Sequence, residues 1–217
     1  MRAELPFRTT VKNVRIRNRT FSFSCPAEPA DVLDSITNEE YNRDQFLPYW
    51  AEQWPSCEVL LPFLDRMPLA EKGASVCEIG SGLGIAAVML CASGFDATAF
   101  EISPVACRYI RANMARNGCR GGVVCADWRH SPFTRRFDLI AGSDILYEER
   151  WIEPVLRFIS GSVAPDGAAL IADPCRKYWG WFLRSAPLHG LTAQVLHREQ
   201  TNGGKTTVEI AELRGTQ

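Results

Sequence analysis

The sequence predicts an α/β protein: a doubly wound, seven-stranded, mostly parallel sheet with an antiparallel C-terminal strand, preceded by an N-terminal β-hairpin arm. Two observations carry this fold class. Short apolar segments alternate with helix-forming segments from residue 55 to residue 172, which is typical of a parallel sheet with helices on both faces. The C-terminal segment instead holds two stretches in which apolar and polar residues alternate, as in a terminal β-hairpin. Five parallel strands and this hairpin make seven.

The composition is that of an ordinary globular protein, with 46% hydrophobic and 23% charged residues in a chain of 217. The formal net charge is −1, from 24 basic and 25 acidic side chains, which argues against a protein whose main task is to bind phosphate backbones. No apolar stretch approaches the roughly 20 residues of a membrane helix, and no apolar segment of a signal peptide follows the N-terminal arginines. We therefore expect no membrane partner.

The cysteines give no sign of a disulfide framework or a metal site. None of the eight has C-x-x-C spacing, and the chain has only three histidines. Cys77, Cys91, Cys107 and Cys125 fall inside predicted strands or helices, where cysteine packs as a small apolar residue. We expect reduced thiols in a cytoplasmic protein that holds no metal.

The first 20 residues carry six basic side chains against one acid, which could indicate an arm for nucleic acid or membranes. However, residues 14–17 and 21–24 alternate apolar and polar around a turn at Asn18-Arg19, which favours a half-exposed hairpin with a solvated cationic face. Residues 25–48 are acidic and predict a connector of short helices with caps at Asp31 and Thr37. We expect the hairpin and connector (1–47) to pack on a main domain (48–217).

The remaining elements follow from apolar patterns and their stop signals. A proline in the first turn and Asn117-Gly118 after the last turn bound one helix, and Asn202-Gly203-Gly204 separates the two terminal strands. The predicted elements are helices over 59–67 (ended by Pro68), 85–92, 104–117 and 149–163, and strands over 74–79, 97–100, 123–126, 137–142, 168–172, 191–197 and 206–213.

A glycine-rich loop, Glu78-Ile79-Gly80-Ser81-Gly82-Leu83-Gly84, joins the first of these strands to a helix. Glycines at such a junction let the backbone turn tightly and approach a ligand closely. A dinucleotide-binding loop would place its third glycine at Ile85, and a P-loop would need a lysine. The loop alone could be a tight turn, but its pattern is an acid followed by three alternate glycines.

Two acids at later strand ends sharpen this signal. Glu101 ends the second parallel strand, where a carboxylate can accept hydrogen bonds from both hydroxyls of a ribose. Asp127 follows the third strand and could accept from an adenine amino group, while Trp128 could cover the ring. Taken singly, Glu101 could be a helix cap and Trp128 a core anchor. Together they predict a pocket for an adenosine without a pyrophosphate.

This set resembles the class I, seven-stranded methyltransferases that use S-adenosylmethionine, a Rossmann-like fold, over about residues 50–213. In that family the acid before the glycine loop faces the methionine end of the cofactor, as Glu78 would here. The resemblance implies S-adenosyl-L-methionine as cofactor, S-adenosyl-L-homocysteine as product, and a methyltransferase domain over 48–217.

Two further segments resemble methyltransferase family 16, the small protein-lysine methyltransferases with a D-x-x-Y motif that act on the electron transfer flavoprotein β subunit, chaperones and elongation factors. They are residues 48–56, which are rich in tryptophan, and 143–149, in which Asp144 and Tyr147 match the motif. Residues 171–174 look like the fifth strand's end in the flavoprotein branch, with Cys175 where glycine is expected. The resemblance implies that Asp144 and Tyr147 are catalytic and that the cofactor contacts Trp54, Glu78, Gly80, Ser81, Gly82, Gly84, Glu101, Ile102, Asp127, Trp128 and Ser143.

The chemistry assigns Asp144 a limited role. A lysine must lose its proton to attack, and a carboxylate favours the charged ammonium. We therefore expect Asp144 to capture and orient the amine and Tyr147 to wall the channel, with no strong general base. Asp144 could instead cap the following helix, and Trp50 and Trp54 could be core aromatics that share one helical face.

The resemblance favours an enzyme that methylates a protein lysine, and other functions stay open. For the oligomeric state, a monomer is only the default expectation. The main alternative is a small-molecule, nicotinamide-type N-methyltransferase. Amino-methylating nucleic-acid enzymes often carry N/D-P-P-Y/F after the fourth strand, whereas this chain has D-I-L-Y over 144–147, so we do not expect a nucleic-acid partner. An NAD-dependent oxidoreductase shares the sheet but is disfavoured by Ile85. A partner-binding module on an inactive fold is the remaining class.

Overall fold

A computed structural model describes residues 5–66 and 73–216, so the predicted helix end at Met67-Pro68 lies outside the described residues. The strands are β1 (Thr9–Ile16), β2 (Arg19–Pro26), β3 (Ser75–Ile79), β4 (Asp96–Glu101), β5 (Gly122–Cys125), β6 (Phe137–Ser143), β7 (Val163–Asp173), β8 (Leu191–Thr201) and β9 (Thr206–Gly215). The α-helices are α1 (Pro29–Asp34), α2 (Asn38–Asp44), α3 (Pro55–Arg66), α4 (Ile85–Ala92), α5 (Pro104–Arg116), α6 (Ile152–Ser162) and α7 (Trp179–Ser185).

The main sheet has seven strands in the order β5-β4-β3-β6-β7-β9-β8, which confirms the predicted fold class. Strands β5, β4, β3, β6 and β7 pair in parallel, and β9 runs antiparallel to both β7 and β8. The predicted terminal hairpin is present as β8 and β9, with β9 inside the sheet and β8 at its edge. Strand β9 is mostly buried and β8 mostly exposed, so the more apolar strand takes the inner position.

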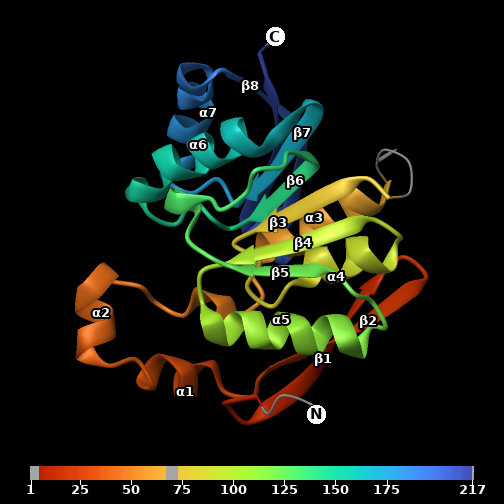
Figure 1. The fold of residues 1–217 in the computed structure, drawn as a ribbon, viewed down its shortest axis with the longest axis vertical. Coiled ribbons are helices and arrows are strands. Elements are labelled where there is room, and N and C mark those ends of the chain that lie inside the picture. Colours follow the sequence, from red (N-terminus) through yellow and green to blue (C-terminus); the bar gives the residue numbers. More distant parts are fainter. Residues whose placement is uncertain (1–4, 67–72, 217) are drawn as a thin grey trace.

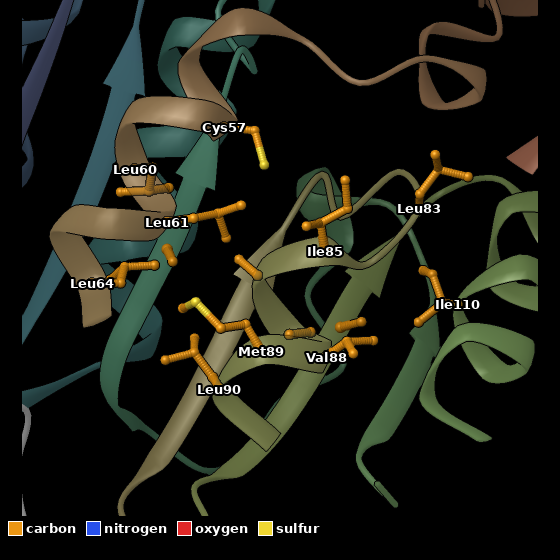
Figure 2. Packing of buried hydrophobic residues seen from close by; sticks show 14 of the residues in the cluster. Cys57, Leu60, Leu61, Leu64, Leu83, Ile85, Val88, Met89, Leu90 and Ile110 are labelled. Carbon is orange, nitrogen blue, oxygen red and sulfur yellow. The ribbon is translucent and has the colours of Figure 1, made fainter. Parts of the chain in front are cut away.

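Helices cover both faces of this sheet, with α3, α4 and α5 on one side and α6 and α7 on the other (Figure 1). Figure 2 shows the hydrophobic core on the side of α3, α4 and α5, where Leu61 and Leu64 of α3 lie against Met89 of α4. Helix α7 was not predicted, although its Trp179 and Phe182 are buried with the i, i+3 spacing of a short apolar helix face. Within the described parts of the chain, no helix is both long and apolar enough to cross a membrane.

The predicted N-terminal hairpin is present as β1 and β2, with a turn at Arg17-Asn18, one residue earlier than expected, because Ile16 pairs with Arg19. The hairpin packs on α5 through the buried amide of Asn113, whose Oδ1 accepts from Ser24 N at 2.7 Å. The same amide donates to Leu83 O at 3.0 Å. The hairpin is therefore tied, through one side chain, to the back of the glycine loop.

The predicted connector forms two short helices, α1 and α2. Thr37 directly precedes α2, whereas Asp31 lies in the first turn of α1 and Glu28 takes the N-cap position, so Asp31 is not the expected cap. In Figure 1, α1 lies below α5 and α2 lies to the left of the sheet. From there the chain returns over the carboxyl ends of the parallel strands to enter α3.

Candidate active site

A pocket of about 180 Å³ opens at the carboxyl ends of β3, β4, β5 and β6, where open α/β sheets bind ligands. Twelve of the thirteen predicted site residues line it: Trp54, Glu78, Gly80, Ser81, Gly82, Glu101, Ile102, Asp127, Trp128, Ser143, Asp144 and Tyr147. Gly84 does not. It is the N-cap of α4 with φ 75°, and a Cβ there would lie 2.9 Å from Ile110 Cγ2, so its role is the close packing of α4 on α5.

The glycine loop is shaped by hydrogen bonds from its own polar residues. Ser81 Oγ donates to Glu78 O at 2.7 Å and accepts from Phe100 N at 3.0 Å, which binds the loop to β4. The Glu78 carboxylate accepts from Ala86 N at 3.2 Å and Ala87 N at 2.9 Å, at the positive end of α4. Burial nevertheless raises the pKa of Glu78 to about 7, so this carboxyl titrates near neutrality.

Glu101 holds the middle of the pocket. Its Oε2 accepts from Gly82 N at 2.8 Å and its Oε1 from Ser103 N at 2.9 Å, and burial raises its pKa. Ser103 itself caps α5 by accepting from Ala106 N at 3.2 Å, so Glu101 is not the helix cap. Each carboxylate oxygen has room for a further hydrogen bond, as two ribose hydroxyls would need.

At the far end, Asp127 is engaged by Arg129, whose backbone N and Nε lie 2.8 and 2.7 Å from its two carboxylate oxygens. Burial acts to raise the pKa of Asp127, but these hydrogen bonds outweigh it and the pKa lies below its usual value. Trp128 packs edge-on against Trp151 with ring centroids 5.5 Å apart. Its Nε1 is buried and has no hydrogen-bond partner in the described part of the chain.

Asp144 sits immediately after β6 with φ 58°, a left-handed conformation that is rare for a residue with a side chain. Its Oδ2 accepts from Ser56 N at 2.9 Å, so the carboxylate caps the start of α3 and not, as the alternative interpretation held, the helix that follows it. Its Oδ1 forms an ion pair with Arg176 Nη1 at 2.7 Å. Burial still raises the pKa of Asp144 above its usual value.

Aromatic rings wall the pocket next to Asp144. The centroid of Tyr49 lies 4.6 Å from that of Tyr147 and 6.0 Å from that of Trp54. The idea that Trp50 and Trp54 share a helical face is wrong, because only Trp50 is in the short 3₁₀ helix 49–51, where it packs on Tyr109. Burial raises the pKa of Tyr147, so its hydroxyl stays protonated.

Several lining residues were not predicted as site residues, notably Phe46, Leu47, Tyr49 and Arg176. The first two follow α2, whose Asp44 is held by Arg129 Nη2 at 2.6 Å and Arg150 Nη1 at 3.2 Å. This ion pair network fixes the connector beside the pocket. Arg176 had one available signal, since it follows the Asp173-Pro174 pair that ends β7.

The residues present fit an adenosine with a short charged tail. Two buried carboxylates, Glu78 and Glu101, stand at the loop, and the unpartnered Trp128 Nε1 marks the other end. A Cβ on Gly80 would lie 2.7 Å from Ile145 Cγ2, so the absence of a side chain there keeps the pocket floor open. In the described residues no cluster of three or more His, Cys, Asp or Glu side chains could hold a metal ion.

A doubly wound seven-stranded sheet with an inserted antiparallel last strand, and a pocket of this kind at its carboxyl edge, define the class I methyltransferase fold. The profile of a family described as "Methyltransferase domain" matches residues 42–203, and the chain belongs to that family. The predicted resemblance is thus confirmed.

Among curated proteins, the chain is 30% identical to the electron transfer flavoprotein beta subunit lysine methyltransferase of Mus musculus over 167 residues, 75% of this chain and 66% of the relative. It is 31% identical to the calmodulin-lysine N-methyltransferase of Arabidopsis thaliana over 141 residues, 60% and 45% of the two chains. The chain thus spans about two thirds or less of the length of these relatives.

Among solved structures, a 16S rRNA methyltransferase of T. Thermophilus in complex with AdoMet and guanosine matches 99% of this chain and 52% of its own, with a TM-score of 0.70 and 15% identity. A TehB-like SAM-dependent methyltransferase of Corynebacterium glutamicum covers 68% of this chain and 83% of its own, with a TM-score of 0.55 and 21% identity. At these identities the likeness shows the fold.

Proposed function

We propose that this chain is an S-adenosylmethionine-dependent N-methyltransferase whose acceptor is a lysine side chain of a protein. The observation that carries the proposal is that Asp144 and Tyr147 of the D-x-x-Y motif line the same pocket as Glu78, Gly80 and Glu101. An amine-binding carboxylate and a nucleoside-binding set therefore share one cavity. The names of the relatives, which are lysine methyltransferases, support the acceptor class.

The cofactor would be held at three places. The backbone of the glycine loop and the Glu78 carboxylate would bind the methionine end, Glu101 the ribose hydroxyls, and Asp127 with Trp128 the adenine. When bound, S-adenosylmethionine supplies a methyl group on a cationic sulfur that is already a good leaving group. The residues of the chain therefore contribute orientation and exclusion of water.

The amine end of the pocket determines how a lysine would enter. Deprotonating a free lysine at pH 7 takes roughly 4–5 kcal/mol, and a partly dry pocket lowers this by disfavouring the ammonium. The rings of Tyr49, Trp54 and Tyr147 form apolar walls of this part of the pocket. The ring centroids of Tyr49 and Tyr147 are only 4.6 Å apart. Asp144 opposes deprotonation by stabilising the ammonium, so we assign it to binding and orienting the amine.

The direct test is incubation of the protein and labelled cofactor with host-cell lysate, followed by separation into protein and small-molecule fractions. Label on a protein band, recovered as methyl-lysine after complete acid hydrolysis of that band, is the expected result. Label only in the small-molecule fraction would support the alternative of a small-amine methyltransferase, and no label in either fraction would contradict both.

The catalytic assignment is tested by Asp144→Asn, which keeps the size of the side chain and an oxygen for Ser56 N. We expect S-adenosylhomocysteine affinity within about threefold of wild type and loss of most turnover, because the amine loses its charged partner. Asp96→Asn is the matched control. Asp96 pairs with Arg135 at 2.8 Å at the start of β4, whereas the pocket lies at the end of that strand. Unchanged turnover of Asp144→Asn would remove Asp144 from the mechanism.

We also propose a monomeric, cytoplasmic enzyme in which residues 1–47 form an arm on a catalytic domain of residues 48–217. All eight cysteines are free, which suits a reducing compartment. The hydrogen bonds of Asn113 to Ser24 support an arm packed on the core. Light scattering of the purified chain tests the oligomeric state, and fractionation of cells expressing it tests the compartment.

A further inference from the structure

Two carboxylates at the amine end of the pocket share one arginine. Asp144 follows β6 and Asp173 ends β7, and these strands are neighbours in the sheet. Arg176 Nη1 lies 2.7 Å from Asp144 Oδ1 and 3.4 Å from Asp173 Oδ2. The backbone N of Arg176 also donates to Asp173 Oδ1 at 2.7 Å. One guanidinium nitrogen therefore serves both acids.

The charges in this cluster do not balance. The side chains of Asp144 and Asp173 are 3% and 0% exposed, so two buried acids face one cation. Burial raises the pKa of Asp173 to about 6, and the neighbouring Asp144 adds to the shift. The neighbouring Glu209, which pairs with Asp173 across β7 and β9, is a third acid. It is already bound by Arg198 and by Trp179 Nε1, so it leaves the charges of Asp144, Asp173 and Arg176 as they are. The site has room for a second positive charge.

Arg176 is the member of the cluster that can move. Its side chain is 26% exposed, and it lies on the short loop between β7 and α7. Its guanidinium carbon stands 5.8 Å from the centre of the Trp54 ring, on the wall of the amine channel. Asp144 is held in place by Ser56 N, and Asp173 by the end of its strand. An incoming cation would therefore displace Arg176 and leave the carboxylates in position.

We infer that Arg176 is a displaceable counter-ion: it occupies Asp144 Oδ1 until a substrate ammonium arrives, and Asp173 receives it when it is displaced. The inference rests on the proposed function, since it assumes that the substrate is an amine. Arg176 is then a positioning residue that acts through Asp144. The site selects an acceptor that enters as a primary ammonium, whose compact charge fits the place of one guanidinium nitrogen.

The test uses n-butylammonium, which has the charge and the end of a lysine side chain, as the probe. Its dissociation constant for the complex with S-adenosylhomocysteine is measured by ligand-observed NMR titration at pH 8, where the probe is still protonated. We expect Arg176→Gln to bind the probe about threefold to tenfold more tightly than wild type, because the competing cation is gone. Arg176→Lys should stay within about threefold of wild type, because it keeps a cation there.

Asp173→Asn removes the place to which Arg176 moves. We expect it to weaken probe binding about tenfold, and the double variant Asp173→Asn/Arg176→Gln to recover to wild-type binding or better. Arg157→Gln is the matched control, since Arg157 forms an exposed pair with Glu153 on α6. A merely structural role for Arg176 predicts the opposite order: weaker binding by Arg176→Gln, and a double variant at least as weak as Asp173→Asn.

That opposite order, or no probe binding by wild type at tens of millimolar, would overturn the inference. If Asp173→Asn does not fold, the comparison of Arg176→Gln with Arg176→Lys decides alone, because the Arg176 side chain is partly exposed. The proposed function is read separately, from S-adenosylhomocysteine affinity and from label transfer to protein. Label transfer to protein with the opposite order of probe affinities would overturn the inference about Arg176 and leave the proposed function supported. The expected order of probe affinities without label transfer would contradict the proposed function alone.

Discussion

Gly80 provides the sharpest test of the pocket's geometry. It has φ 59°, and a Cβ there would lie 2.7 Å from Ile145 Cγ2 and 3.2 Å from Trp128 Cζ3. Ile145 is buried and branched, so its methyl group cannot swing away freely. In Gly80→Ala the left-handed backbone is disfavoured by about 1 kcal/mol and the overpacking by about 1–3 kcal/mol. We expect the free energy of unfolding to fall by roughly 2–4 kcal/mol.

Two other glycines separate these contributions. Gly118→Ala has the same backbone problem, with φ 69°, but nothing lies within 4 Å of its Cβ, so only the conformational part of about 1 kcal/mol should appear. Gly161→Ala, inside α6 with open space around the Cβ, should leave stability unchanged or raise it by up to about 1 kcal/mol. Urea unfolding of the three variants measures the series.

Binding is the second measurement on the same proteins. Relief of the contact in Gly80→Ala requires Ile145 or Trp128 to move, and both line the pocket. Calorimetric titration should show S-adenosylhomocysteine affinity lowered by tenfold or more, about 1.4 kcal/mol, with Gly118→Ala unchanged. Equal losses of stability in Gly80→Ala and Gly118→Ala would refute the reasoning, because the contact with Ile145 would then carry no energy.

Three further predictions follow from other parts of the site. Because burial raises the folded pKa of Glu78 from 4.5 to about 7, the stability that this carboxyl contributes is present below pH 4.5 and lost as pH rises through 7. Glu78→Gln should remove that decline, so the difference in unfolding free energy between wild type and variant should change by about 3 kcal/mol between pH 4 and pH 8 in urea titrations. Asp44→Asn loses partly exposed ion pairs with Arg129 and Arg150, so S-adenosylhomocysteine affinity should fall about threefold to tenfold at low salt, and calorimetry at high salt should show a smaller loss. Cys175 has φ 56°, so Cys175→Gly should leave stability unchanged or raise it by up to about 1 kcal/mol in thermal melts, and a loss would contradict the strain argument.

Local signals explain what the sequence could predict. The helix predicted over 85–92 matches α4, because glycines precede it and Ser93-Gly94 ends it. The positions of Glu78 and Glu101 follow in the same way, since each stands at or near the end of a short apolar strand. Even the glycine expected at 175 has a physical reason, as the chain there adopts the left-handed conformation that glycine favours.

Contacts between distant segments explain what could not be predicted. Asp144 caps α3 through Ser56, which is 88 residues earlier in the chain, and Asp44 meets Arg129 across 85 residues. Neither pairing leaves a trace in the local pattern of apolar and polar residues. The order of β8 and β9 is likewise decided by which strand buries both faces, and alternation alone does not distinguish an inner strand from an edge strand.

Residues with a strained, left-handed backbone fall into two groups, one at hairpin turns and one near the pocket. Five non-glycine residues in the described part of the chain have positive φ, and two of them, Arg17 and Asn202, lie at hairpin turns where such angles are ordinary. The other three are Gln45, Asp144 and Cys175, which stand after the Asp44 ion pairs, at the motif carboxylate and beside Arg176. Each left-handed residue destabilises the fold by about 1–3 kcal/mol unless its surroundings hold it. Here the surroundings are ion pairs around one pocket, so the strain and the buried charge lie where the proposed chemistry needs fixed carboxylates and a movable arginine.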